Sequence, residues 1–197
     1  MKKIFFSFVV VLFVGSRVFA NETAILQTQF ENKIQEVVSI VKDKTLSKES
    51  RNDKIVKAIT PMFDFELMAK LSLGKVWQSL TSNDQRKFVE LYVKRMKTSY
   101  SSKLDSYSDE KVVIKSVDQI KVNRIQIATN LVSGQKQMDI LYKFHKPKLP
   151  ILGKNDWVIY DVEILGVSIL KTDMAQFKGF LQNNSIYDLM NSLEKQI

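Results

Sequence analysis

The spacing of apolar residues changes twice along this chain, and these changes restrict the folds that it can adopt. From residue 22 to about residue 105, apolar residues recur every three or four positions, as they do on one face of a helix. From Lys111 to Leu165 they alternate with polar residues, which is typical of strands in a sheet with one face covered. After Leu165 the helical spacing returns. This order favours an α+β fold, with helices covering an antiparallel sheet, over alternating strands and helices around a parallel sheet.

Start and stop signals divide the first part of the chain into four helices. Proline cannot continue a helix, so the helix that begins after Ser47 ends at Thr60-Pro61. Asp64 is a good N-cap for the next helix, and Gly74 suits the left-handed residue that follows its last turn. The predicted ranges are 22–43, 48–60, 65–73 and, as the longest helix, 83–105 capped by Thr81 or Ser82.

The alternating part of the chain predicts strands, and two helices follow them. Ser133-Gly134 is expected to turn the chain between two of the strands. The closing helices carry Phe177 and Leu181 on one apolar face and Leu189 and Leu193 on another. The predicted strands cover 112–122, 125–131, 138–144 and 157–165.

Residues 1–20 have the pattern of a secretory signal peptide. Met1-Lys2-Lys3 is a charged start, Ile4 to Val14 is apolar, and Val18-Phe19-Ala20 provides a cleavage site. An uncleaved anchor is less favoured, because the apolar run is shorter than the roughly 20 residues of a spanning helix. We therefore expect export, cleavage after Ala20, and a single domain with a helical lobe over 21–197.

Charge and cysteine content narrow the choice of partners. The chain has 30 basic and 21 acidic residues, and three of the basic ones lie in the predicted signal peptide, so its removal lowers the net charge from +9 to +6. Because the lysines are dispersed, a solvated basic surface is favoured over nucleic-acid binding, with attraction to anionic membranes or acidic partners as the alternative. Without cysteine there is no disulfide and no lipoprotein attachment, so the core alone must supply stability.

The candidate catalytic residues are few. His145 is the single histidine, it lies between Lys143 and Lys146, and no second histidine could share a metal. We expect it to be a solvated surface residue. Asp161 and Glu163 lie two apart and face the same side of a strand, which we expect to be its solvent side. Glycine-rich phosphate loops are absent. The sequence therefore predicts neither an enzyme nor a cofactor or metal site.

Aromatic and methionine residues occupy many of the positions that the periodicity turns inward. Judged by periodicity alone, these residues form an ordinary core, since large apolar side chains are usually buried. A cavity for a lipid is the alternative. Periodicity does not separate the two, because both place the same side chains on the inner face.

Three segments resemble the MlaC family of periplasmic phospholipid-binding proteins, also called the toluene-tolerance auxiliary family. No single segment is specific, but their order and spacing are, and together the similarity extends over nearly the whole chain after residue 20. The segments are F-D-F-E-L-M-A-K-L-S-L-G-K-V-W over 63–77, the helix start T-S-N-D-Q-R-K-F over 81–88, and W-V-I-Y-D-V over 157–162 with G-V-S over 166–168.

Two features depart from the family pattern. Asp173-Met174 stands where many members have Tyr-Arg, so these positions are assigned no role. The loop from Lys146 to Lys154 is longer than usual and contains Leu149-Pro150-Ile151-Leu152. This loop is interpreted as a hairpin connection, with an apolar tip that touches a partner or a membrane as the alternative.

The resemblance implies a curved, nuclear-transport-factor-like sheet packed by N-terminal and C-terminal helices around the tails of a phospholipid. It implies a periplasmic carrier that works between an outer-membrane lipoprotein–porin complex and an inner-membrane ABC transporter with an MCE-domain subunit. We expect a monomer that binds no nucleic acid; a periplasmic chaperone or a small-ligand module is the alternative. The predicted lipid-binding residues are Leu73, Trp77, Tyr92, Met96, Ile125, Ile127, Met138, Ile140, Tyr142, Trp157, Val167, Phe177 and Phe180.

Overall fold

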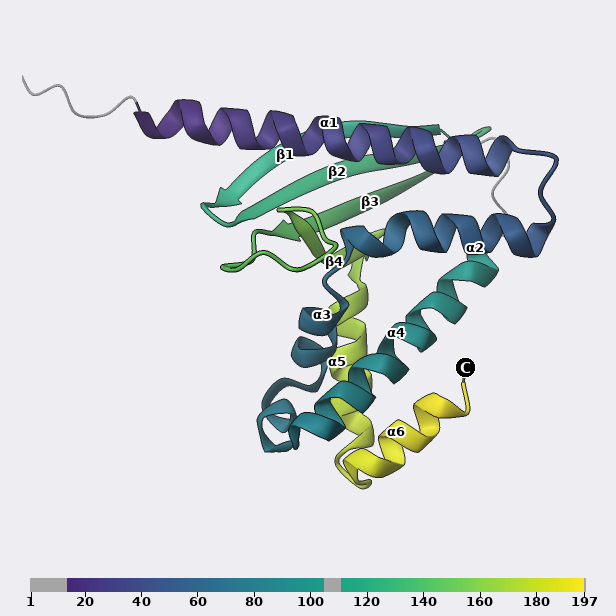
Figure 1. The fold of residues 1–197 in the computed structure, drawn as a ribbon, viewed down its shortest axis with the longest axis vertical. Helices are drawn as coiled ribbons and strands as arrows, with labels where there is room; N and C mark the ends of the chain where they lie inside the picture. The colour runs from purple at the N-terminus through teal and green to yellow at the C-terminus, as the bar shows by residue number, and fades with distance from the viewer. Residues whose placement is uncertain (1–13, 105–110, 197) are drawn as a thin grey trace, which may run out of the picture.

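The computed structural model describes the backbone of residues 14–104 and 111–196, and most of the predicted signal peptide, 1–13, lies outside the described residues. The four predicted N-terminal helices are present (Figure 1). The prediction that 83–105 forms the longest helix is wrong, because the first helix extends back into residues assigned to the signal peptide. The helices are α1 (Val14–Lys42), α2 (Lys48–Ile59), α3 (Phe65–Leu73) and α4 (Ser82–Leu104), with 3-10 turns η1 (Thr60–Met62) and η2 (Gly74–Ser79).

The helix ends lie where the capping signals predict them. The Asp64 carboxylate accepts a hydrogen bond from the Leu67 amide at 3.0 Å, and the Thr81 hydroxyl accepts one from the Asp84 amide at 3.1 Å. Each bond satisfies a backbone donor that the first helical turn leaves unpaired. Gly74 has a φ of 56°, which a residue with a β-carbon adopts only at a cost. Local sequence therefore sets the limits of α3 and the start of α4.

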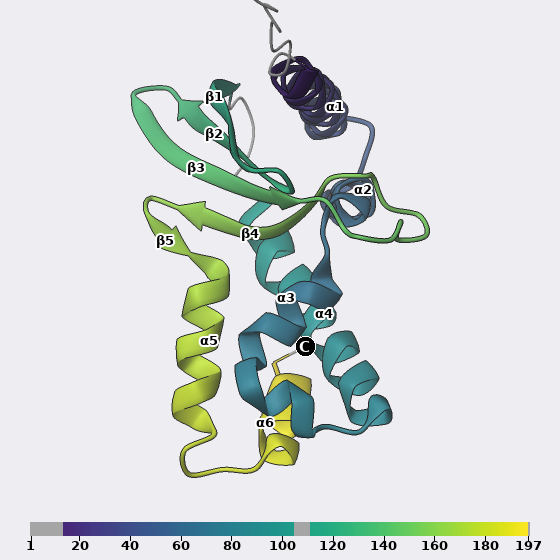
Figure 2. The same cartoon turned by 90° about the vertical axis from the view of Figure 1, so that its left-hand side faces the viewer.

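The strands form one antiparallel sheet in the order β1-β2-β3-β4-β5. Register shifts between Ile114 and Ser116 in β1 and between Lys143 and Phe144 in β3 are irregularities of the kind that bend a sheet, and Figure 2 shows its curvature. The predicted α+β class with a curved antiparallel sheet is confirmed. The strands are β1 (Lys111–Lys121), β2 (Arg124–Ser133), β3 (Lys136–His145), β4 (Val158–Ile164) and the short β5 (Val167–Ser168).

Helices α1 and α2 run antiparallel over one face of the sheet, and the remaining helices form a lobe below it (Figures 1 and 2). That lobe contains α3 and α4 together with α5 (Ile169–Phe180) and α6 (Ile186–Glu194). No helix among the residues described combines the length and the apolar composition needed to cross a bilayer.

The buried side chains form two separate cores. One lies within the helical lobe around Phe88, Tyr92 and Phe177, and the other lies between α1 and the sheet around Phe30 and Ile127. Partly buried Phe63 and Ile169 pack against both cores. The fold is therefore two packed bodies with a narrow joint, rather than one continuous interior.

Asp173, which the sequence analysis assigned no role, lies within the helical lobe and is only 2% exposed. It accepts a hydrogen bond from the Tyr92 hydroxyl at 2.8 Å and pairs with Arg95 at 2.5 Å, so it joins α5 to α4. The Arg95 guanidinium also lies 5.4 Å from the centre of the Phe177 ring. A buried ion pair of this kind becomes costly when only one partner is removed.

We therefore expect Asp173→Ala to lower the free energy of unfolding by about 3 kcal/mol, because it leaves the Arg95 charge without its partner. Chemical denaturation at neutral pH measures the change. Asp156→Ala, at an exposed aspartate, is the control and should change stability by no more than about 0.5 kcal/mol. Equal effects of the two substitutions would contradict the structural role of Asp173.

Candidate functional site

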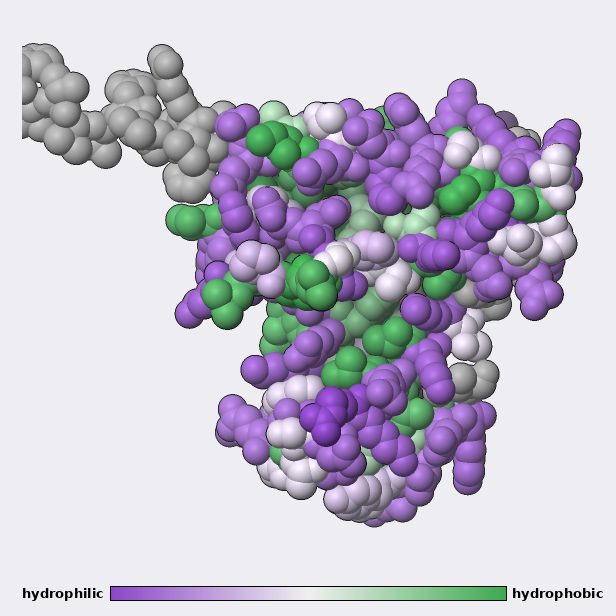
Figure 3. Space-filling view, viewed as in Figure 1, coloured by the Kyte–Doolittle hydropathy of each residue, from purple (hydrophilic) through white to green (hydrophobic). Residues whose placement is uncertain are grey.

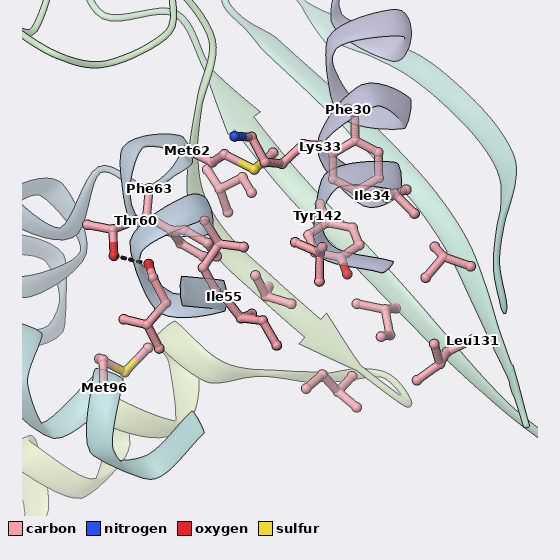
Figure 4. Close-up of a pocket in the computed structure, with 18 of the residues that line it drawn as sticks. Phe30, Lys33, Ile34, Ile55, Thr60, Met62, Phe63, Met96, Leu131 and Tyr142 are labelled. Atoms are coloured by element: carbon pink, nitrogen blue, oxygen red, sulfur yellow. Dashed lines mark hydrogen bonds between the residues drawn. The ribbon is translucent and has the colours of Figure 1, made fainter. Parts of the chain in front are cut away.

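A cavity of about 600 Å³ lies between the sheet and helices α1 and α2, and Met96 of the helical lobe lies at one side of it (Figure 4). Phe30 and Ile34 of α1, Ile55 of α2 and Tyr142 of β3 point into this space. The remaining lining residues are Lys33, Val37, Val38, Val41, Lys42, Val56, Ile59, Thr60, Met62, Phe63, Phe65, Met68, Met96, Lys97, Val112, Leu131, Met138, Ile140, Ile159, Val162, Ile164 and Ile169.

Helical and strand periodicities place these side chains. Ile34, Val37, Val38 and Val41 lie three or four residues apart and therefore form one stripe on α1. On β3, Met138, Ile140 and Tyr142 lie two apart and share the face of the sheet that looks toward the helices. The wall therefore follows from local structure, and the open space follows from the distance at which α1 and α2 are held from the sheet.

The lining is almost entirely apolar, and its few polar groups are cationic or already bonded. None of the described lining residues is acidic, and the charged ones are Lys33, Lys42 and Lys97. Lys33 pairs with Glu36 at 2.5 Å, and the Thr60 hydroxyl donates to the Val56 carbonyl at 2.6 Å. Such a cavity offers extensive van der Waals contact to an apolar ligand.

The predicted lipid-binding residues fall into distinct groups in the structure. Met96, Met138, Ile140 and Tyr142 line the cavity. Val167 does not line the cavity and is 61% exposed, but in the register of β4 and β5 it lies opposite Ile164, a lining residue, and so shares the inner face of the sheet. The others lie in packed interior: Ile125, Ile127 and Trp157 between α1 and the sheet, and Leu73, Trp77, Tyr92, Phe177 and Phe180 in the helical lobe. Contact of these residues with lipid stays a prediction.

Sequence reasoning did not select the wall that α1 and α2 provide. Its signal was present, since the apolar stripe of α1 continues from Leu26 and Phe30 into Ile34 and Val41. Leu26 is 2% exposed in the packed core, Phe30 is 3% exposed and stands where the core meets the cavity, and Ile34 and Val41 border the cavity. Spacing shows which face of a helix turns inward, but it does not show whether the space opposite that face is filled.

Two expectations about polar residues are corrected by the structure. His145, expected at the surface, is 7% exposed, and its Nε2 lies 2.7 Å from Oδ2 of Asp64. Asp161, expected on a solvent side, is 3% exposed and accepts hydrogen bonds from the Ser168 hydroxyl, the Leu170 amide and Lys143. Both carboxylates join strands to helix starts, since Asp64 caps α3 and contacts β3, and Asp161 of β4 accepts from the first residues of α5.

The pair formed by Asp64 and His145 holds the start of α3 against the end of β3. Burial of the Asp64 carboxylate disfavours its charged form, but hydrogen bonds from His145 and the Leu67 amide outweigh that cost. The pKa of Asp64 is therefore lowered from its ordinary value of 3.8. Next to Asp64, Phe63 lines the cavity, so this polar pair fixes one part of the wall.

These features define a class of protein: an α+β protein whose curved antiparallel sheet and N-terminal helices enclose an apolar cavity without acidic groups in its wall. The family model for the MlaC protein matches residues 31–195. This chain belongs to the MlaC family, as its sequence motifs predicted.

Two known proteins show what the chain resembles in sequence and in fold. It is 25% identical over 146 residues to the intermembrane phospholipid transport system binding protein MlaC of Haemophilus influenzae, which covers 74% of this chain and 65% of that protein. The chain thus spans slightly less than two thirds of this curated relative. A phospholipid-binding protein from Ralstonia solanacearum, solved in complex with a phospholipid, matches with a TM-score of 0.74 at 16% identity, over 86% of this chain and 95% of that one. This similarity shows that the two share a fold.

A pH-dependent contribution to stability is expected from Asp64. A carboxylate with a lowered folded-state pKa stabilises the fold above its unfolded-state pKa, and this stabilisation is lost as the pH falls through the folded-state pKa. Asp64→Asn retains a capping oxygen but loses the charge, so we expect it to lower the free energy of unfolding by about 1–3 kcal/mol at neutral pH. The deficit should shrink as the pH drops below 3.8.

Denaturant titrations of both proteins across acidic and neutral pH measure this difference. Asp84→Asn is the control, because Asp84 also lies in the first turn of a helix but is only half-buried, whereas Asp64 is buried. A deficit for Asp64→Asn that stays constant with pH would contradict the assignment.

Proposed function

We propose that this protein is a periplasmic carrier that holds the acyl chains of a phospholipid in the cavity between α1, α2 and the sheet. The observation that carries this proposal is the cavity itself, with a volume of about 600 Å³ and a wall of aliphatic and aromatic side chains. Membership of the MlaC family and the phospholipid bound to the related Ralstonia fold support the same ligand class.

The physical need for such a cavity follows from the cost of exposing lipid tails. Each methylene transferred from hydrocarbon to water costs ~0.8 kcal/mol, so exposing two acyl chains costs on the order of 20 kcal/mol. An apolar cavity replaces bilayer contacts with side-chain contacts and removes most of that barrier. Because the exchange is then nearly neutral in free energy, the carrier can both load and unload.

The charged residues of the lining suit the polar end of a phospholipid. Lys33, Lys42 and Lys97 are all cationic, and Lys42 is exposed. Lys33 already pairs with Glu36, but a lipid phosphate emerging beside Lys42 or Lys97 meets positive charge and no lining carboxylate, which favours anionic over cationic amphiphiles. The lysines complement the ligand, and no chemical step is required of them, so we infer binding and transport rather than catalysis.

The proposed export, processing and partners of the protein are those that the resemblance to the MlaC family implies. The chain is exported, its first 20 residues are removed, and the single domain of 21–197 exchanges lipid as a monomer. Its partners are an outer-membrane lipoprotein–porin complex and an inner-membrane ABC transporter with an MCE-domain subunit. Since the sequence has no phosphate-binding glycine loop, the energy for directional transport comes from such a partner.

A test of the cavity is Val37→Glu, which places a carboxylate in the apolar wall at a half-buried position on α1. We expect the ratio of co-purified phospholipid to protein, measured by mass spectrometry of organic extracts, to fall about tenfold or more. Burying a charge against acyl chains costs more than the 1.4 kcal/mol that corresponds to a factor of about ten. Val113→Glu, at a valine of β1 that is 44% exposed and does not line the cavity, is the matched control and should retain the ratio.

The outcomes separate the alternatives. Stoichiometric phospholipid in the unaltered protein, lost only in Val37→Glu, supports the carrier. Absence of phospholipid from the unaltered protein would favour a chaperone or small-ligand module instead. Full retention of lipid by a correctly folded Val37→Glu would place the lipid elsewhere.

A further inference from the structure

Exposed aliphatic side chains gather at two neighbouring connections of the sheet. In the loop between β3 and β4, Leu149 is 78% exposed and Leu152 is fully exposed at 101%. In the turn between β1 and β2, Val122 is 72% exposed, and Ile120 just before it is 51% exposed. Figure 3 shows green side chains projecting from both connections, and solvation of so many large apolar groups in one region is unfavourable.

The two connections lie side by side. Arg124 pairs with His145 in the antiparallel register of β2 and β3, and the Lys146 amide donates to the Asn123 carbonyl at 3.3 Å. Both are at the end of the sheet beneath the first turns of α1 (Figure 1). The exposed apolar residues of these two neighbouring connections, Ile120, Val122, Leu149 and Leu152, are here called the end face.

Basic residues accompany these aliphatic side chains. Residues 146–156 contain three lysines and one aspartate, and the neighbouring turn adds Lys121 and Arg124. Lys121 and Lys148 are exposed beside Val122 and Leu149. Lys146 instead pairs with Glu22 at 2.7 Å, so this lysine fixes the loop against α1.

The composition of the end face suits a bilayer better than a protein. Energetically dominant residues at protein interfaces are enriched in Trp, Tyr and Arg, whereas Leu and Val are under-represented there and Lys is depleted. Aliphatic side chains with lysines beside them are the combination that binds at the boundary between headgroups and acyl chains of anionic membranes.

We propose that the end face docks on anionic bilayers, with Leu149 and Leu152 entering the boundary between headgroups and acyl chains while Lys121 and Lys148 contact lipid phosphates. The docking goes beyond lipid carriage and does not require an occupied cavity. It has a consequence for carriage only if the proposed function holds. At the base of the same loop, Lys154 donates to the carbonyl of Thr60 at 3.0 Å, and Thr60 lines the cavity, so docking brings that wall close to the membrane.

The test is flotation of the purified protein with vesicles of phosphatidylcholine containing phosphatidylglycerol, compared with vesicles of phosphatidylcholine alone. We expect binding to the anionic vesicles that weakens with added salt, because exposed charges are screened. The double substitution Leu149→Asp/Leu152→Asp should weaken binding about tenfold or more, since it removes two apolar side chains and adds two negative charges.

The matched control is Leu165→Asp/Val167→Asp, which makes the same kind of change at residues 66% and 61% exposed at the turn before β5. It should bind vesicles almost as the unaltered protein does. Thermal unfolding should show that both double variants remain folded, since all four positions are exposed.

Measuring co-purified phospholipid separates this inference from the proposed function. The Leu149→Asp/Leu152→Asp protein should retain its lipid while failing to float. Failure of the unaltered protein to float with anionic vesicles, or equal flotation of the two double variants, would overturn the docking. Equal flotation with both vesicle types would overturn the role of the lysines.

Discussion

The cavity exists because two packed cores are held apart at a narrow joint. At that joint Phe63 pairs with Ile159 in a single parallel bridge, and the Asp64 amide donates to the Ile159 carbonyl at 2.9 Å. The Asp64 carboxylate then contacts His145 at the end of β3. These bonds fix the start of α3 against the sheet, so α1 and α2 span the remaining space instead of collapsing into it.

Because the wall of the cavity is apolar, the buried polar side chains must lie elsewhere in the fold. In a chain without disulfides, buried carboxylates connect elements that hydrophobic packing alone would leave free to slide. Asp64 joins α3 to β3, Asp161 joins β4 to the start of α5, and Asp173 joins α5 to α4. Each of the three carboxylates accepts hydrogen bonds and lies outside the cavity lining. The buried polar contacts and the apolar cavity therefore occupy different parts of the fold.

Much of this fold can be predicted from the sequence, because local signals determine it. Capping residues such as Asp64 and Thr81, and Gly74 after α3, set helix limits that the structure reproduces. Strand β5 was not predicted, because its two residues are too few to show an alternation of apolar and polar side chains. The contacts of His145 and Asp173 were also missed, because their partners lie 81 residues away along the chain. Periodicity likewise identified an inward face on β3 but gave no measure of the empty volume in front of it.

The distribution of charge links the interior to the surface. Several carboxylates are engaged inside, where they neutralise Arg95 and Lys143 or cap helices, and none of the described lining residues is acidic. The basic excess of the sequence is therefore left largely to exposed lysines such as Lys121 and Lys148. The proposed carrier would gain from this division, because the same excess positive charge that repels cationic amphiphiles attracts the anionic surfaces where phospholipid is found. The apolar cavity and the basic surface thus follow from one arrangement, in which buried carboxylates connect neighbouring helices and strands.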